Sequence, residues 1–304
     1  MSKETEKILK QMQTYMKQNG VEDMDEAEMN AMLDDFMQQY NDGVMGSVTE
    51  ETARTSNDFL ELAENADNEG SALKYARKAL KLDSDNLDAE CMIAMISASD
   101  HIDLISKLEK AVVHGKKVME KEGFGDEDSI GSYWGIMETR PYMRLKMEYM
   151  CALNDNGMIR RAIAECEDMI RLNENDNMGV RYILMHLYVL LEEEKKALAL
   201  HQKYDAYEET QMLFPLSVLY FKLGDMDQSL EYLKRLSIAN KDTKKFLRAV
   251  MNGSLERYMD EMSDLGYRPF TIEELIVELM ENRKLFDTVP GYFQWANERL
   301  KGKK

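Results

Sequence analysis

The sequence predicts an all-α fold built from tandem helix pairs, and three observations indicate it. Only four of the 304 residues are proline and 16 are glycine, so few positions interrupt a helix. Apolar residues recur at three- and four-residue spacing, as on one face of a helix. The small residues Ala162, Ala197 and Ser229 each follow a polar turn and are separated by 35 and 32 residues. With 44% hydrophobic residues, the chain can also bury a substantial core.

Residues 1–48 predict an acidic, methionine-rich helical extension. Two amphipathic stretches, 4–18 and 25–40, lie in this segment, which carries eight of the 25 methionines. Such a methionine-rich face either docks on the protein's own core or receives a partner. Residues 1–70 hold 17 acidic and five basic side chains out of a net charge of −18. This excess disfavours nucleic-acid phosphates and anionic membranes, and either keeps the chain soluble or attracts a basic protein.

Residues 49–240 predict degenerate helical repeats. The first pair comprises a helix over 56–65 and an alanine-rich helix that follows it, and a long helix is expected over 103–121. An acidic, glycine-rich loop near 123–131 then interrupts the period. Residues 241–304 predict capping helices, one of them over 272–286 after the cap residue Thr271.

The clearest repeat begins near Met143. A helix ends at a turn containing Gly157, and Ala162 follows five residues later, which is the tetratricopeptide pattern: glycine permits the bend and alanine lets the two helices approach. The same pattern recurs over 179–206 and 214–236, where Gly224 supplies the turn. We therefore expect a tetratricopeptide-like helical-repeat solenoid.

Two motifs resemble a known family. The motifs are YWGIMETRPYMR at 133–144 and LNENDNMGVRYIL at 172–184, and TVPGYFQWA at 288–296 is similar in character. They resemble bacterial tetratricopeptide repeat proteins of the suppressor-of-tumorigenicity family. The residues that match are Trp134, Glu138, Thr139, Arg140, Pro141, Tyr142, Met143 and Arg144 in the first motif, and Leu172, Asn173, Asn175, Asp176, Asn177, Gly179, Val180, Arg181 and Tyr182 in the second. The resemblance implies a helical-repeat fold and no particular reaction, and Ser84 and Glu174 stand where the repeat's usual proline is expected.

Three arginines of these motifs have two interpretations. Arg140, Arg144 and Arg181 lie near acidic side chains, with which they could form an inter-repeat ion-pair network. Alternatively they form an anion or carboxylate site. Pro141 suits the first turn of a helix, where Thr139 is expected to act as the cap.

The first helices of the repeats predict a concave, apolar groove. Its expected lining residues are Arg144, Met147, Cys151, Tyr182, His186, Val189, Phe214, Val218 and Phe221. An apolar groove with an arginine at its edge suits a peptide or a helix. The alternative is that several of these side chains belong to the core.

Signatures of catalysis, metal binding and cofactor binding are missing from the sequence. No glycine-rich phosphate loop or HExxH motif is found, the four histidines lack neighbours at metal-ligand spacing, and the three cysteines form no CxxC pair. We therefore expect no cofactor and no metal. No apolar run has the length of a membrane span or a signal peptide, so a cytoplasmic protein is expected.

The favoured function is a non-catalytic adaptor or scaffold that binds a protein or peptide. One alternative is an acidic inhibitor or decoy of a basic, nucleic-acid-binding protein, based on the charge of residues 1–70. A weaker alternative is an enzyme that uses Glu138, Arg140 and Arg181. The sequence leaves the partner's identity and the oligomeric state open.

Overall fold

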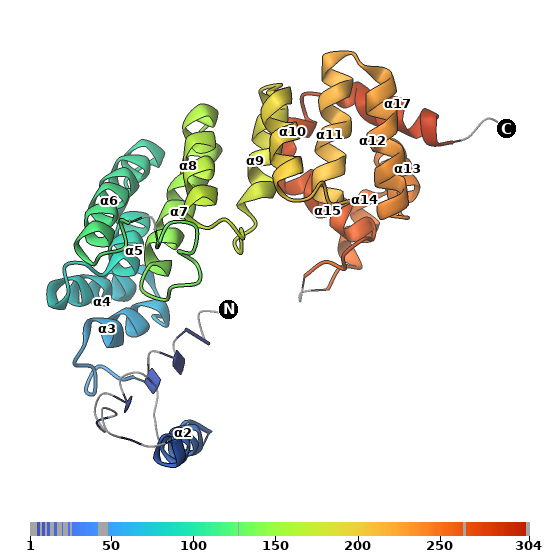
Figure 1. The fold of residues 1–304 in the computed structure, drawn as a ribbon. Coiled ribbons are helices and arrows are strands. Elements are labelled where there is room, and N and C mark those ends of the chain that lie inside the picture. The colour runs from blue at the N-terminus through green and yellow to red at the C-terminus, as the bar shows by residue number, and fades with distance from the viewer. Residues whose placement is uncertain are drawn as a thin grey trace. The chain divides into compact units, whose positions relative to one another are not determined.

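The computed structural model describes residues 5–6, 8–9, 11–12, 15–16, 20, 24, 26–41, 48–126, 128–263 and 266–301. Across these ranges every regular element is a helix, which confirms the predicted all-α class. The chain divides into two compact units, Met1–Ala152 and Leu153–Lys304 (Figure 1). The boundary falls within the region 49–240 that was expected to form one array of repeats. Each unit is therefore described by itself.

The helices of the first unit are α2 (Glu26–Asn41), α3 (Ser56–Glu64), α4 (Glu69–Leu82), α5 (Leu87–Ser97), α6 (His101–Lys121) and α7 (Arg140–Asp155), whose last three residues belong to the second unit. Helices α3 to α6 pack consecutively, α3 on α4, α4 on α5 and α5 on α6. This arrangement confirms the expected first helix pair. Helix α2 matches the second predicted N-terminal stretch, 25–40. The first stretch, 4–18, lies largely outside the described residues, although the residues described between 5 and 16 are helical.

Side-chain caps fix where the helices of the first unit begin. Asn68, Asn86 and Asp100 each accept hydrogen bonds from the first-turn amides of α4, α5 and α6, which satisfies donors that the helix itself cannot pair. Gly115 allows α6 to approach α7, because a Cβ atom there would lie 2.6 Å from the Tyr142 ring. The caps and this close approach hold the first turn of α7, which carries Arg140, beside the preceding helices.

The helices of the second unit are α8 (Ile159–Leu172), α9 (Val180–Leu190), α10 (Glu194–Lys203), α11 (Thr210–Leu223), α12 (Met226–Ala239), α13 (Thr243–Asn252), α14 (Leu255–Asp260), α15 (Ile272–Glu281), α16 (Arg283–Phe286) and α17 (Pro290–Leu300). Helices α9 and α10 pack as one pair, and α11 and α12 as the next. These are the repeats expected over 179–206 and 214–236.

The predicted turn and crossing residues of these repeats are confirmed. Gly157 and Gly224 have φ angles of +73° and +80°, a region that glycine adopts without steric cost. Ala162, Ala197 and Ser229 are fully buried, so a small side chain is what the close helix crossing requires. The helix pairs are therefore tetratricopeptide-like in their turns and in their packing.

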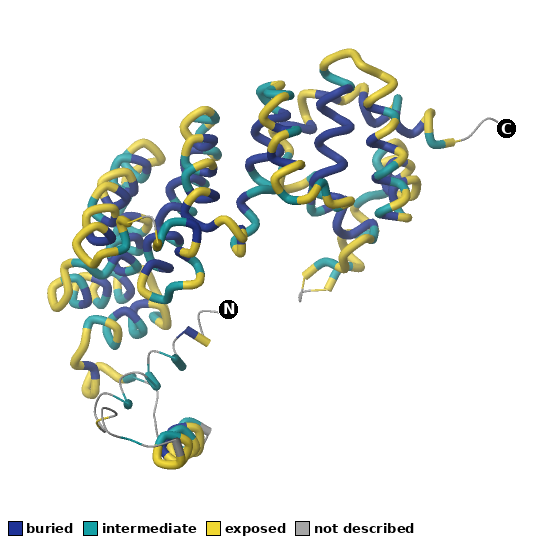
Figure 2. The backbone as a smooth tube through the Cα atoms, in the orientation of Figure 1, coloured by how far each residue is buried: buried dark blue, intermediate teal, exposed yellow. Residues whose placement is uncertain are grey.

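The C-terminal helices fold back onto the repeats of their own unit. Helix α15 packs on α11 and α13, α16 on α9, and α17 on α12 and α13. An aromatic cluster forms between them, consisting of Phe214, Phe246, Phe286, Tyr292 and Phe293. Helix α11 is consequently buried along nearly all of its length (Figure 2). The single helix expected over 272–286 is divided at Asn282 into α15 and α16.

Candidate functional site

The structure corrects the expected groove in the second unit. His186, Val189, Phe214 and Val218 are at most 3% exposed, so these four residues are core and do not form a surface. The physical reason is the return of the C-terminal helices: Phe214 stacks against Phe286 with ring centroids 4.6 Å apart. The periodicity placed these side chains on one helix face, and that face is covered by the chain itself.

His186 forms a buried ion pair in this core. Its Nε2 lies 2.8 Å from a carboxylate oxygen of Glu278 in α15, and its Nδ1 lies 2.8 Å from the carbonyl oxygen of Tyr182. Burial alone lowers the pKa of His186, but Glu278, the Tyr182 carbonyl and Glu281 outweigh it and raise this pKa above its usual value. The pair fastens α15 to α9.

Tyr182 is half-buried and packs against its neighbour Arg181. The Arg181 guanidinium lies 4.2 Å from the centre of the Tyr182 ring and 5.1 Å from that of Tyr204, an arrangement in which the cation is attracted to the ring faces. Arg181 also pairs with Asp176 at 3.1 Å and lies 3.6 Å from Glu209. Arg181 is therefore ion-paired with the acidic turn of its own motif.

Asp176 has a second role at the start of α9. Its carboxylate accepts hydrogen bonds from the backbone amides of Val180 and Arg181, at 2.7 and 3.0 Å. Its φ of +47° turns the chain at this point. Asp176 thus satisfies two backbone amides of the first turn of α9.

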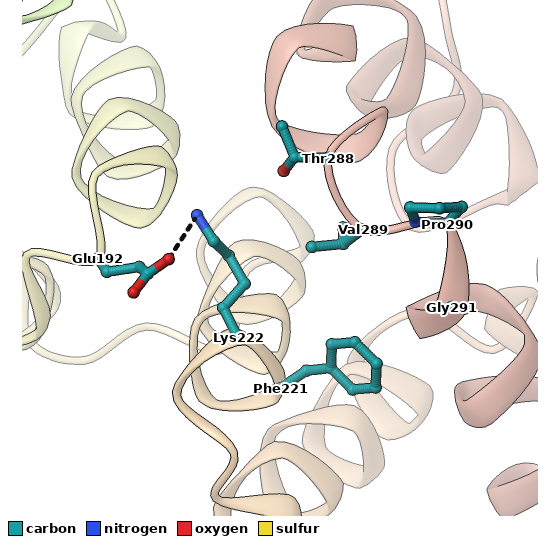
Figure 3. Close-up of a pocket in the computed structure, with 7 residues that line it drawn as sticks. All are labelled: Glu192, Phe221, Lys222, Thr288, Val289, Pro290 and Gly291. Carbon is teal, nitrogen blue, oxygen red and sulfur yellow. Dashed lines mark ion pairs between the residues drawn. The ribbon is translucent and has the colours of Figure 1, made fainter.

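Phe221, another expected groove residue, lines an open pocket of about 570 Å³ in the second unit. The lining side chains come from three segments, the end of α11, the turn after α9 and the start of α17 (Figure 3). They are Glu192, Phe221, Lys222, Thr288, Val289, Pro290 and Gly291. The position of Gly291 leaves room, since a Cβ atom there would meet only the tip of the Phe221 ring at 3.9 Å.

Lys222 is fixed at one side of this pocket. Its amine donates hydrogen bonds to the carbonyl oxygens of Val189 and Leu190, at 2.9 and 2.7 Å, and lies 3.5 Å from Glu192 (Figure 3). These carbonyls end α9, where a cation is favourable. The pocket therefore has an apolar side formed by Phe221 and Val289 and a charged side formed by Lys222 with Glu192.

In the first unit, Arg140 and Arg144 of α7 contact the carboxylates of Asp88 in α5 and of Glu6. We call these two arginines, together with Asp88 and Trp134, the arginine site. Arg144 binds Asp88 through two hydrogen bonds of 2.8 and 2.6 Å, and binds Glu6 through two of 2.9 and 3.2 Å. Arg140 lies 3.9 Å from the same Glu6 carboxylate. Burial alone lowers the pKa of Arg144, but Asp88 and Glu6 outweigh it and raise this pKa above its usual value.

Trp134 orients Arg140. The Nε of Arg140 donates a 2.8 Å hydrogen bond to the Trp134 carbonyl oxygen, and its guanidinium lies 5.6 Å from the Trp134 ring centre. The Thr139 hydroxyl does not act as the expected helix cap. It donates to the carbonyl oxygens of Tyr133 and Ile136 instead. Pro141 does occupy the first turn of α7, as predicted.

The remaining expected site residues are distributed over both units. Met147 and Cys151 of α7 are half-buried, and Glu138 is exposed. Arg140 belongs to the first unit and Arg181 to the second, and each has its own set of contacts. Among the described residues, no cluster of His, Cys, Asp or Glu could hold a metal ion, and no helix has the length and apolarity needed to cross a membrane.

Glu6 and Asp88 were missed by the sequence interpretation. They lie 138 and 56 residues away from Arg144, and no local pattern in the sequence connects such distant positions. Asp88 did carry one signal in the sequence, its place in the first turn of a helix. An acidic residue is favourable there without any further partner, so this signal did not point to Arg144. Its pairing with Arg144 became visible only in the fold.

Comparison with known proteins finds likeness among solved structures. No protein-family model matches the chain, and none of the curated proteins matches it. Among solved structures, the crystal structure of MamA protein is similar, with a TM-score of 0.44 and 16% sequence identity over 62% of this chain and 94% of that one. The fold assignment rests on the helices themselves. The family resemblance of residues 133–144 and 172–184 remains a prediction.

Proposed function

We propose that the protein is a non-catalytic scaffold that binds a protein or peptide segment, with the pocket around Phe221 as a contact site. The observation that carries this proposal is the pocket itself, open to solvent and built from three segments of the second unit. Its volume lies within the range of roughly 300–1,000 Å³ that is usual for ligand sites. Helix pairs in tandem supply a stable support for such a site.

The chemistry of the pocket suits a bulky apolar side chain with a polar neighbour. The rings of Phe221 and Pro290 and the Val289 side chain provide apolar contact. Lys222 and Glu192 already pair with each other, so they favour a neutral or zwitterionic neighbour over a strongly charged one. The described lining residues offer no nucleophile and base in contact, which supports binding over catalysis.

Filling the pocket tests the proposal. Gly291 has a helical backbone at the start of α17 and is exposed, so Gly291→Leu adds an apolar side chain beside Phe221 without backbone strain. We expect partners recovered by affinity purification with the unaltered chain to be reduced at least roughly tenfold with this variant, a loss equal to about 1.4 kcal/mol of binding free energy. Quantitative mass spectrometry of the recovered proteins measures it.

Phe270→Asp is the matched control. Phe270 is 54% exposed in the same unit and does not line the pocket, and aspartate tolerates its positive φ of +59°. Partners should be retained by this variant. A folded Gly291→Leu protein that keeps every partner would remove the pocket from the proposal.

The proposal also includes the cellular context expected from the sequence. A cytoplasmic location in a bacterium, and membership of the group similar to suppressor-of-tumorigenicity proteins, fit the two motifs at 133–144 and 172–184. Cell fractionation with an antibody to the protein tests the location, and recovery in the membrane or extracellular fraction would contradict it.

A further inference from the structure

We propose that the arginine site of the first unit is a receptor for a glutamate-bearing helical peptide, and that the chain's own Glu6 occupies it as a built-in ligand. This inference concerns α7 and does not depend on the pocket around Phe221. Glu6 is only 5% exposed, although it lies in the acidic N-terminal extension.

The arginine site is held in shape by contacts that do not involve Glu6. Arg144 is fixed by the two hydrogen bonds that it donates to the Asp88 carboxylate, and Arg140 by the carbonyl oxygen and ring of Trp134. The two arginines are four residues apart on α7 and therefore share a helix face. If Glu6 leaves, these supports remain, so the site is preorganised for another carboxylate and loses little entropy on binding it.

Charge makes the site selective for an acid. With Glu6 bound, its carboxylate and that of Asp88 lie against the guanidinium groups of Arg140 and Arg144. When Glu6 leaves, one negative charge is removed from beside two partly buried positive charges. A positive charge away from water is costly without a partner. A carboxylate that offers two oxygens to Arg144, as Glu6 does, restores the balance.

The occupant shows what kind of peptide the site fits. The described residues around Glu6 are helical, and Ile8 and Leu9 are half-buried. The matching ligand is therefore an amphipathic helix with one glutamate followed two and three residues later by large apolar side chains. Tethering gives Glu6 an effective concentration on the order of millimolar, so a separate peptide competes poorly until the segment is displaced.

A peptide-binding experiment tests this assignment on the full chain. The probe is a fluorescein-labelled synthetic peptide with the sequence of residues 1–18, and the protein carries Glu6→Lys, which places a positive charge against Arg144 and vacates the site. Fluorescence anisotropy should show binding at least roughly tenfold tighter than to the unaltered chain. Raising the salt concentration should weaken it, since ion pairs contribute.

Further variants separate a carboxylate receptor from general stickiness. The same peptide with glutamine in place of Glu6 should bind at least roughly tenfold more weakly. Adding Arg144→Gln to the Glu6→Lys protein should abolish binding, while Arg77→Gln, at an exposed arginine of α4, should not change it. If Arg144→Gln unfolds the first unit, as judged by circular dichroism, Arg140→Gln replaces it with the same expectation.

The outcomes decide the proposal. Equal binding to the Glu6→Lys and unaltered proteins, equal binding of the glutamine peptide, or no binding to any variant would each overturn it. Adding Gly291→Leu to the Glu6→Lys protein should leave peptide binding unchanged, because Gly291 lies in the second unit. Failure of the pocket around Phe221 and failure of the arginine site are thus distinguishable.

Discussion

Ser217 of α11 and Ser229 of α12 exchange hydrogen bonds, each hydroxyl donating to the other residue's backbone carbonyl oxygen at 2.9 and 2.7 Å. Both residues are fully buried. The Tyr292 hydroxyl of α17 donates a further 2.8 Å bond to the Ser217 hydroxyl. Two serines therefore connect a repeat pair to the helix that folds back over it.

Ser217→Ala should destabilise the protein. It removes the donor to Ser229 and leaves the fully buried Tyr292 hydroxyl without the acceptor it has now. We expect a loss of about 1–3 kcal/mol in the free energy of unfolding, the usual cost of such a buried polar group. Urea denaturation followed by circular dichroism measures it. Ser237→Ala, on the exposed side of α12, should change the free energy by less than about 0.5 kcal/mol.

Ala162→Leu should destabilise the second unit through overpacking. Ala162 is 0% exposed on α8, and a larger side chain forces the surrounding helices apart, at a cost of about 1–3 kcal/mol. Ala164 lies two residues further on the same helix and is exposed, so Ala164→Leu is the matched control, with a change within about 0.5 kcal/mol. Equal thermal unfolding of the two variants would contradict a close helix crossing at residue 162.

Gly224→Ala should cost about 1 kcal/mol in the free energy of unfolding. Its φ of +80° lies in the left-handed region, where a Cβ atom clashes with the backbone. Gly291→Ala should have the opposite sign, a gain of roughly 0.5–1 kcal/mol, because Gly291 is helical and its Cβ position is open. Denaturant titrations of the two variants in parallel test this difference in sign.

The His186–Glu278 pair should make stability depend on pH. The pKa of His186 is raised in the folded state, so the folded protein holds its proton more tightly than the unfolded chain does. The stabilisation is fully present below the unfolded pKa of about 6.5 and is lost as pH rises through the folded pKa. Between the unfolded and the folded pKa of His186, only the folded state keeps this proton. In that pH range the free energy of unfolding should fall by up to about 1.4 kcal/mol per pH unit.

Glu278→Gln tests the origin of that slope. Without the carboxylate 2.8 Å from Nε2, burial of His186 is no longer offset by its main partner, and the decline above pH 6.5 should largely disappear. Denaturation at half-unit steps from pH 6 to 9 measures it. His101→Gln, at an exposed histidine of α6, should leave the profile as it is. An unchanged slope in Glu278→Gln would contradict this pair as the source.

The sequence predicted most of the local architecture. Helix spacing and the residues Gly157, Gly224, Ala162 and Ala197 reflect steric demands within one helix pair, and these demands appear directly as residue type and interval. Thr271 likewise signals the start of α15 through its own side chain. Such features are local, so a single sequence is sufficient to identify them.

The candidate sites were only partly predictable, because they depend on distant contacts. Periodicity showed that His186 and Phe214 share a face with apolar neighbours, but it could not show whether solvent or another helix covers that face. The answer came from Glu278 and Phe286, 92 and 72 residues away. Of the two interpretations of Arg144, the structure shows ion pairs with Glu6 and Asp88, and the carboxylate site remains a proposal.

The folded-back C-terminal helices have a consequence for synthesis on the ribosome. Phe214 has its full set of aromatic neighbours only when Tyr292 and Phe293 have been translated, and contacts so distant in sequence form late and slowly. During that interval the inner face of α11 lacks its cover, and an exposed aromatic surface is prone to aggregation. Slower translation of the residues between Phe214 and Tyr292 lengthens this exposure, and a chaperone that covers α11 during that interval would protect the nascent second unit.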